Sequence, residues 1–555
     1  MFIKNLEKHL KYKKYYKPNS LYWGMGIENE FYLEFDKKIP FNRDKFLKNH
    51  KPERYSVNYF NNYKTEIIDN LFPKIDYDGE LPLLFNSHSF SKTDKNNNSK
   101  TLYSTQYVKN PSFDGETLWE FIERNNSYLK KTYGENLVFD GDSIELITVN
   151  FYNGKLDDII DELEMNKRMF IENLQDVFNK NNIFQQYGKI NIMKKNHPYA
   201  VMLSNIDNVG MFNNGTLHFN ITLPTELNEK SEIKNLFQFI SQHRNYIKLI
   251  QFMEPLMLCN YGEADPLSEL DNRLSFCSQR GSVSRYIGIG TYDTRRMEFG
   301  KKLVDDLENF EITKENGWYN KYYKHCGYKR LEKIGYDINF NKHYNHGVEI
   351  RFFEHQNNVE KIREILKFLI LLGDYSLDFE IENNPIVLED WNNLVFESMK
   401  FGKNTKIKNN IFDELFNEKF ISNNIIDLYY EIFAYLEKKY KEGGKFSMYC
   451  MNRNINEIKS SIEKNREIIQ SQITNEIEKL KIGLENKISK IEENTVKINN
   501  NVGNIVNLVS KDNIKNEVVC LKNQVSNQIV SKVNNEINRN ASNLEQKSKK
   551  CCTIL

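Results

Sequence analysis

The stretch from Gly24 to Phe35 constrains the fold most, because its alternating pattern predicts a strand whose two faces differ in chemistry. One face carries Ile27, Phe31, Leu33 and Phe35, with Asn29 among them. The other face carries Glu28, Glu30, Tyr32 and Glu34. Neighbours on one face of a strand lie roughly 6–7 Å apart, so these carboxylates repel one another unless a cation lies between them. Either this face is solvated, as in many antiparallel strands, or its carboxylates bind a divalent cation such as Mg²⁺.

The charge balance, aromatic content and cysteines of the 555-residue chain narrow its class. Lys and Arg total 77 and Asp and Glu total 76, so the chain lacks the basic surplus of a general nucleic-acid binder. Aromatic residues make up 13%, which is typical of a folded rather than a disordered chain. Seven scattered cysteines without a CxxC pair disfavour a zinc knuckle and fit a reducing compartment. We expect no signal peptide and no transmembrane helix, because no apolar run approaches about 20 residues.

Two later segments repeat the design of the first strand. Their polar positions are His218 and Asn220 in residues 215–224, and Glu349 and Arg351 in residues 347–354. Taken singly, a strand histidine is often a structural hydrogen-bonding group, and a Glu–Arg pair is often part of a cross-strand ion-pair ladder. Together, the three strands predict one sheet with an apolar face against helices and a polar face lined by carboxylates, an imidazole and a guanidinium. Those groups suit two Mg²⁺ ions and a nucleoside triphosphate.

Other segments predict helices around this sheet, and therefore an α+β fold. Apolar spacing predicts helices over residues 118–133, 156–178, 233–259, 359–372, 391–400 and 425–440. Residues 37–110 are polar, and we expect them to be irregular. Residues 139–149 predict a turn at Gly141 that leads into a strand, as in a hairpin at the edge of a sheet, with Asp142 and Glu145 as its acidic groups.

Five arginines gather within 24 residues beside a glycine-rich segment. They are Arg273, Arg280, Arg285, Arg295 and Arg296. A guanidinium matches phosphate geometry, so this region is either a phosphate-binding segment or a basic surface loop. The chain contains no GxxxxGK[ST] motif, so it has no P-loop.

Four of these segments, taken together, resemble the amidoligases, which are carboxylate–amine ligases of the glutamine synthetase and glutamate–cysteine ligase fold. The motifs are GIENEF (26–31), DGDSIEL (140–146), LHFN (217–220) and VEIR (348–351), and they occur in the order typical of that family. Residues 253–262 resemble the helix-to-loop segment that precedes the arginine region in the same family. The resemblance covers roughly residues 20–380. It implies a glutamine synthetase-like antiparallel sheet with helices packed on one face.

The resemblance also implies roles for individual residues. Mg²⁺, two ions or more, would be held by Glu28, Glu30, Glu145, His218 and Glu349. The second motif has an extra residue between DG and Ser, so Asp142 competes with Glu145 for its position. Arg351, with one or more of Arg280, Arg285 and Arg295, would contact phosphate or carboxylate, and Asn220 would support the nucleotide or substrate.

The chemistry implied by the resemblance is amide-bond formation driven by ATP. A carboxylate is a poor electrophile, so ATP phosphorylates it to an acyl phosphate, and an amine then displaces phosphate. Mg²⁺ and arginine would neutralise the charge of the migrating phosphoryl group. Substrates could be small molecules or peptides. The alternatives are a catalytically inactive ligase-fold head on a membrane-anchored scaffold, and a nucleotide-binding module without turnover.

The C-terminal quarter has a different composition, and we divide the chain into residues 1–445, 446–546 and 547–555. From Ile455 to Ile537, Ile, Val and Leu recur every three or four residues with polar residues between them. This narrow stripe predicts a coiled coil, and self-association is favoured over a single helix lying on the first domain.

The last residues predict lipidation. Cys552-Thr553-Ile554-Leu555 has the form of a geranylgeranylation signal, and Cys551 could be palmitoylated. The lysines just upstream would attract anionic lipids. Two lipid signals give stable anchoring, so we expect the protein on the cytoplasmic side of a membrane in a eukaryotic cell, whether as a cellular, viral or delivered protein.

Overall fold

The computed structural model describes most of the first 451 residues and parts of the C-terminal quarter. The described residues are 16–42, 79–91, 117–141, 143–194, 215–264, 276–280, 288–301, 317–318, 320–321, 335–340, 347–408, 411–451, 478, 481–483, 485–500, 523–532 and 534–535. The chain forms two compact units, Met1–Asn452 and Arg453–Leu555.

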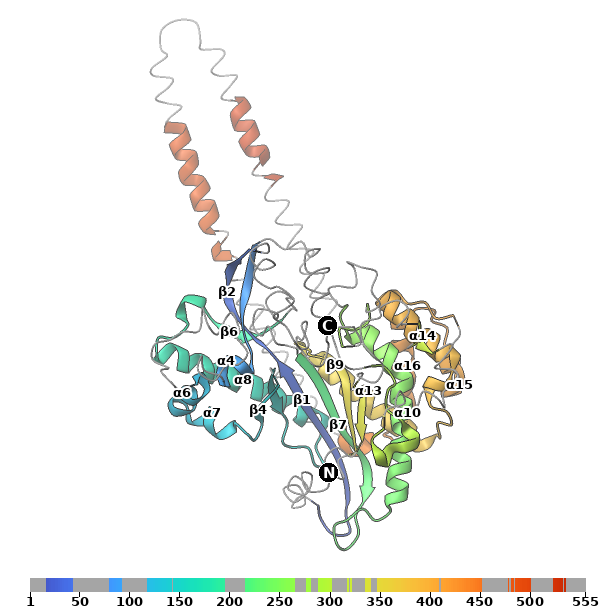
Figure 1. Cartoon of the computed structure of the whole chain (residues 1–555). Coiled ribbons are helices and arrows are strands. Elements are labelled where there is room, and N and C mark those ends of the chain that lie inside the picture. The colour runs from blue at the N-terminus through green and yellow to red at the C-terminus, as the bar shows by residue number, and fades with distance from the viewer. Residues whose placement is uncertain are drawn as a thin grey trace, which may run out of the picture. The chain divides into compact units, whose positions relative to one another are not determined.

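A six-stranded sheet is the centre of the first unit, and its strand order is β4-β5-β1-β7-β9-β8 (Figure 1). Every neighbouring pair in it is antiparallel. The strands are β1 (Leu21–Phe31), β4 (Leu137–Asp140), β5 (Ser143–Ile147), β7 (Gly215–Glu226), β8 (Ile338–Phe340) and β9 (Val348–Glu354). The three strands with matching polar faces are therefore adjacent members of one sheet, as predicted. The hairpin of β4 and β5 at the edge was also predicted.

The first strand is shorter than the alternating pattern predicted. It ends at Phe31, and a separate strand, β2 (Leu33–Phe41), begins after Tyr32 and joins a second sheet with the order β3-β2-β6. Phe31, Tyr32 and Leu33 are all fully buried, so the chain here passes through the core instead of presenting one polar side. Glu34 therefore belongs to the second sheet, and its expected place beside Glu28 and Glu30 was wrong.

The prediction that residues 37–110 are irregular was also wrong in part. They include the end of β2, together with β3 (Gly79–Phe85) and α4 (Ser87–Ser91); β6 (Ile190–Ile192) completes the small sheet. Leu81, Leu83, Leu84 and Phe85 of β3 are buried, so a short apolar run within polar sequence was enough to form a strand.

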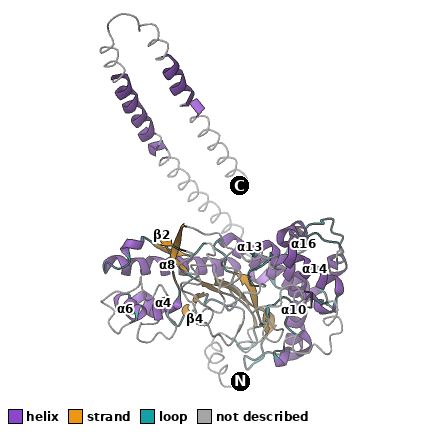
Figure 2. Cartoon of the chain, turned by 45° about the horizontal axis from the view of Figure 1, so that its top comes forward, coloured by secondary structure: helices purple, strands orange, loops and turns teal. Residues whose placement is uncertain are grey.

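Helices pack against the six-stranded sheet and one another, so the fold is α+β with antiparallel sheets (Figure 2). α8 (Leu156–Lys180) contacts β1 and β5, and α10 (Leu236–Tyr261) contacts β7 and β9. α13 (Val359–Asp378) contacts both helices. α14 (Glu389–Phe401) and α16 (Ile425–Lys439) pack on α10. Ile27, Phe219 and Ile350 from three adjacent strands are completely buried, as expected for the apolar face of the sheet.

Capping residues explain where two helices depart from the predicted ranges. α10 begins at Leu236 because the side chain of Asn235 accepts a hydrogen bond from the backbone N–H of Gln238. The predicted helix over 118–133 is two helices, α6 (Leu118–Asn125) and α7 (Ser127–Thr132). Asn126 between them is extended, and its side chain accepts from the N–H of Leu129 to cap α7.

The first unit continues through the short helix α17 (Ser447–Cys450). Asp374 of α13 accepts hydrogen bonds from the backbone N–H groups of Phe446 and Ser447, and Phe446 is fully buried.

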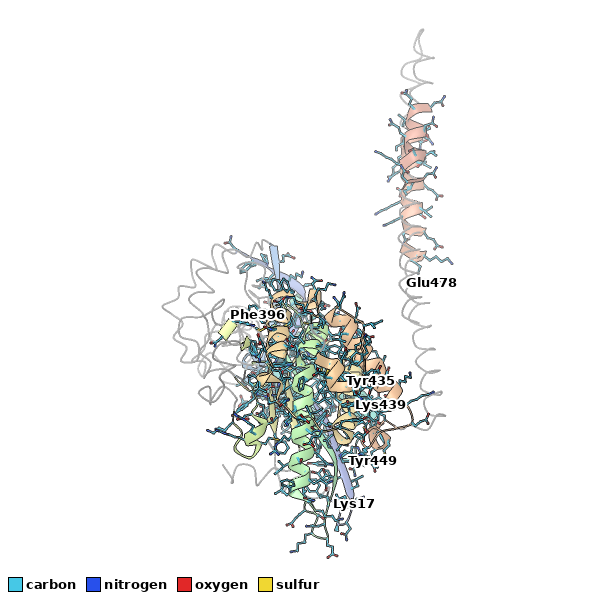
Figure 3. The ribbon with its side chains drawn as sticks, turned by 90° about the vertical axis from the view of Figure 1, so that its right-hand side faces the viewer. Lys17, Phe396, Tyr435, Lys439, Tyr449 and Glu478 are labelled. Carbon is cyan, nitrogen blue, oxygen red and sulfur yellow. The ribbon has the colours of Figure 1, made fainter. Side chains whose placement is uncertain are left out.

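On the neighbouring helix α16, the ammonium group of Lys439 lies 5.7 Å from the ring centre of Tyr435 (Figure 3).

In the second unit, residues 485–500 and 523–532 are helical. The apolar side chains Ile488, Ile491 and Ile498 are 42–48% exposed. Among the described helices of both units, none combines the length and apolar character needed to cross a lipid bilayer.

Candidate metal centre

Cross-strand register brings the polar side chains of β1, β7 and β9 together. Glu28 on β1 lies directly opposite His218 on β7, and Asn220 on β7 lies directly opposite Glu349 on β9. Directly opposite residues in antiparallel strands point to the same face. The polar positions predicted separately on three strands therefore form one cluster.

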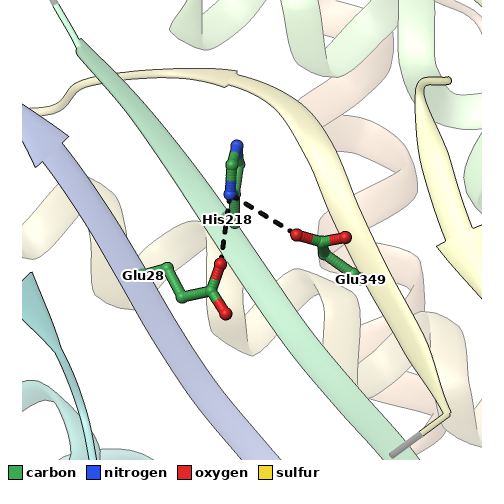
Figure 4. A group of neighbouring side chains, drawn as sticks. All are labelled: Glu28, His218 and Glu349. Atoms are coloured by element: carbon green, nitrogen blue, oxygen red, sulfur yellow. Dashed lines mark hydrogen bonds and ion pairs between the residues drawn. The ribbon is translucent and has the colours of Figure 1, made fainter. Parts of the chain in front are cut away.

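The centre of the cluster is a triad of Glu28, His218 and Glu349 (Figure 4). The Nδ1 atom of His218 lies 3.3 Å from Oε2 of Glu28 and 3.6 Å from Oε1 of Glu349. One ligand atom from each residue lies within 4.8 Å of the other two. The side chains of His218 and Glu349 are 6% and 1% exposed, and that of Glu28 is 13% exposed.

This donor set fits a divalent cation. Two carboxylates held this far from water repel each other, so a positive charge between them stabilises the arrangement. Mg²⁺ binds its oxygen ligands at about 2.0–2.1 Å, so ligands of one ion lie within about 4 Å of each other, close to the observed spacing. Carboxylates with one imidazole also suit Mn²⁺ and Zn²⁺. Small side-chain movements are enough to complete such a site.

Each triad residue has a neutral hydrogen-bonding partner. The amide of Asn220 donates to Oε1 of Glu28 at 3.1 Å, and the amide of Asn339 on β8 donates to Oε2 of Glu349 at 2.7 Å. Thr216 Oγ1 lies 3.2 Å from Nε2 of His218. Partners of this kind orient metal ligands. Asn339 was missed because its three-residue strand is too short to show a clear alternation.

Glu30 and Glu145 form a second acidic pair on the same face. Glu30 lies directly opposite Glu145 on β5 and directly opposite Thr216 on β7. Glu145 is buried, whereas Glu30 is partly exposed. The competing candidate Asp142 lies outside the described residues. Glu30 lies two residues from Glu28 on the same face of β1, so a second cation could bind beside the triad.

The candidate arginines have different positions. Nε of Arg351 lies 3.7 Å from Oε2 of Glu349, so this guanidinium borders the triad. The backbone N–H of Arg280 donates to Oε1 of Glu354 at the end of β9, and Arg280 is buried. Arg295 donates through Nε and Nη2 to the two carboxylate oxygens of Asp293, and this fork occupies the geometry that a phosphate would use. Arg285 lies outside the described residues, as do the candidate lipidation sites Cys551 and Cys552.

A buried carboxyl pair secures the segment that carries Arg295. Oε2 of Glu254 on α10 accepts from the N–H of Gly290, and Oδ1 of Asp337 accepts from the N–H of Tyr292. Both carboxyl groups are completely buried. Burial raises the pKa of Glu254 well above its ordinary range, and the neighbouring Asp337 raises it further; burial also raises the pKa of Asp337. Burial and the proximity of Asp337 therefore both favour the protonated form of Glu254.

Comparison with known proteins finds a viral relative. The chain is 40% identical over 395 residues to the uncharacterized protein R704 of Acanthamoeba polyphaga mimivirus. The match covers 70% of this chain and 69% of the relative. No protein-family model matches the chain.

Proposed function

This chain belongs to the same protein family as the mimivirus protein R704, and we propose that it is an ATP- and Mg²⁺-dependent carboxylate–amine ligase of the amidoligase type. The observation that carries the proposal is the convergence of Glu28, His218 and Glu349 from three adjacent antiparallel strands. Glu28 and His218 are 190 positions apart in the sequence. A cluster of residues that are distant in sequence is characteristic of a functional site assembled by the fold, and not of charges that are merely neighbours in the chain.

The proposal assigns a glutamine synthetase-like fold to the first unit. Support comes from its six-stranded antiparallel sheet, whose apolar face packs on α8 and α10 and whose polar face carries the acidic groups. The described residues of the amidoligase-like motifs lie on β1, on the hairpin of β4 and β5, and on β7 and β9 of this sheet.

In the proposed mechanism, Glu28, His218 and Glu349 would hold one cation, and Glu30 with Glu145 would hold another. Mg²⁺ at these positions would neutralise the triphosphate and the transferred phosphoryl group. Arg351, beside Glu349, would bind an oxygen of the phosphate or of the substrate carboxylate. The carboxylate oxygen attacks the γ-phosphorus and ADP leaves. An amine then attacks the acyl carbon, phosphate leaves with the C–O bond electrons, and the amine loses a proton.

The proposal gives the second unit a tethering role. The exposed isoleucines at 488, 491 and 498 are spaced by three and seven residues, as expected for a coiled-coil seam that another copy of the chain would cover. Lipidation at Cys552, with Cys551 as a second site, would attach the protein to a membrane. A Cys552→Ser variant expressed in eukaryotic cells should move from the membrane fraction to the soluble fraction. Unchanged partitioning would remove the tether from the proposal.

The test of the proposed function is ADP release in the presence of pooled carboxylates and amines. Wild-type protein should release ADP over many turnovers only with Mg²⁺ and both substrate pools, whereas Glu28→Gln and Glu349→Gln should release almost none. Glu34→Gln is the matched control, because Glu34 belongs to the same alternating stretch from Gly24 to Phe35 but lies in the three-stranded sheet. Mg-ATP binding without turnover would favour an inactive ligase-fold head. No binding of Mg-ATP by wild-type protein would contradict the proposal.

A further inference from the structure

His218 contacts different partners through its two ring nitrogens. Nδ1 faces the carboxylates of Glu28 and Glu349, and Nε2 faces Oγ1 of Thr216 at 3.2 Å. Thr216 and His218 are both buried on the same face of β7. A neutral imidazole carries a proton on one nitrogen and a lone pair on the other. His218 can therefore bind a cation between the carboxylates only in the tautomer whose proton is on Nε2 and whose lone pair is on Nδ1.

The backbone at Thr216 is held by buried neighbours on the opposite side of the sheet. The amide nitrogen of Asn29 donates to the backbone carbonyl of Thr216 at 3.0 Å and lies 2.8 Å from Nδ1 of His355. Burial lowers the pKa of His355 to about 3, so its ring is neutral and accepts this second hydrogen bond. Nε2 of His355 donates in turn to Oδ1 of Asn357. Both hydrogens of the Asn29 amide are thereby used, which fixes the β7 backbone at Thr216.

We propose that Thr216 is a positioning residue whose hydroxyl accepts the Nε2–H of His218 and thereby directs the Nδ1 lone pair to the cation between Glu28 and Glu349. This inference rests on the metal centre of the proposed function. With the opposite tautomer, Nδ1–H donates to Glu28 and no lone pair reaches the cation. An acceptor at Nε2 stabilises the tautomer that can bind, which is the usual role of a ligand histidine's second partner.

A purely structural explanation of Thr216 predicts something different. Threonine is common in strands because its branched side chain packs well there. If packing were its role, valine of nearly the same shape would replace it without consequence, and serine would leave a small cavity. If the hydroxyl positions His218, serine retains the function and valine loses it.

The test is Mn²⁺ affinity in the full-length chain, measured from the electron paramagnetic resonance signal of free Mn²⁺. Thr216→Val should bind about 10–100-fold more weakly than wild type, as expected for loss of a ligand's second partner. Thr216→Ser should bind within about threefold of wild type, because the acceptor is retained. Thr222→Val, on the same strand face, should not change the affinity. Wild-type affinity in Thr216→Val would overturn the proposal.

A spectroscopic readout separates the role of Thr216 from the metal centre itself. In protein labelled with ¹⁵N-histidine, adding Mg²⁺ should shift the Nδ1 resonance of His218 and leave Nε2 protonated, and Thr216→Val should lose this pattern. His218→Gln assigns the signals. If wild type and His218→Gln bind Mn²⁺ equally, the metal centre fails and Thr216 fails with it. If wild type binds Mn²⁺ and His218→Gln does not, the metal centre stands. If Thr216→Val then keeps the same tautomer of His218, the role of Thr216 is excluded.

Discussion

Glu28 and His218 are direct neighbours across β1 and β7, and their side chains meet at 3.3 Å although 190 residues separate them in sequence. Glu349 completes the group from β9 on the other side of β7. Three strands that alternate polar and apolar residues thus converge on one charged cluster because they are adjacent in the sheet. The account depends on this cluster being a cation site.

Replacing Arg351 by Gln should weaken nucleotide binding without weakening cation binding. The guanidinium lies 3.7 Å from Glu349, so it repels a cation held there and attracts a phosphate. Without it, Mn²⁺ affinity in the absence of nucleotide should stay the same or rise, and ATP affinity should fall about tenfold or more. Calorimetric titrations with each ligand measure both effects. Parallel losses of both affinities would contradict this role for Arg351.

Replacing Glu254 by Gln should flatten the pH dependence of stability. The pKa of Glu254 is raised from an ordinary value of 4.5, so the folded chain keeps a proton that the unfolded chain releases. The stabilisation is therefore complete below pH 4.5 and declines as pH rises toward the folded-state pKa, by up to about 1.4 kcal/mol per pH unit. The amide of the substituted side chain carries no titrating proton. Urea unfolding between pH 5 and pH 8 should show a shallower decline for Glu254→Gln, and identical slopes would contradict the raised pKa of Glu254.

Replacing Gly290 by Ala should destabilise the arginine-bearing segment. Gly290 has a φ of +63°, and an added Cβ would lie 2.5 Å from Cη2 of the buried Trp391 ring. The left-handed backbone costs about 1–2 kcal/mol for alanine, and overpacking adds about 1–3 kcal/mol. Gly300→Ala is the control, because its φ is +58° but its added Cβ would meet nothing within 4 Å. Chemical unfolding should show a clearly larger loss for Gly290→Ala, and equal losses would argue against the contact with Trp391.

Ending the chain at Asn452 should remove self-association and leave the first unit folded. The first unit extends to this residue and includes α17, which is bound through Asp374. Analytical ultracentrifugation should find the full chain as an oligomer and the shortened chain as a monomer, with unchanged thermal unfolding of the first unit. A monomeric full-length chain would exclude the proposed coiled coil.

Much of the main sheet was predictable, because strands with one buried face repeat an alternating pattern that survives in the sequence. The polar positions of β1, β7 and β9 were predicted in this way. The pattern misled at Tyr32, since alternation continues through the point where the chain leaves one sheet for another. Asn339 and Asp337 could not be assigned from sequence, because their roles depend on contacts with Glu349 and Glu254 across the fold.

For the arginines, the sequence suggested a role that a tertiary contact argues against. Arg295 looked available for phosphate, but Asp293, two residues away, occupies its guanidinium. A nearby acid in sequence does not reveal whether the two side chains meet. Asp293 caps the short helix over Thr294–Phe299, and its side chain also accepts a hydrogen bond from the backbone N–H of Arg295.

The most direct test of the central claim is a crystal structure with Mn²⁺ and a non-hydrolysable ATP analogue, located by anomalous scattering. The account predicts an anomalous peak bonded to Nδ1 of His218 and to carboxylate oxygens of Glu28 and Glu349, with the phosphates beside it. A peak elsewhere, or none at this cluster under saturating Mn²⁺, would contradict the account.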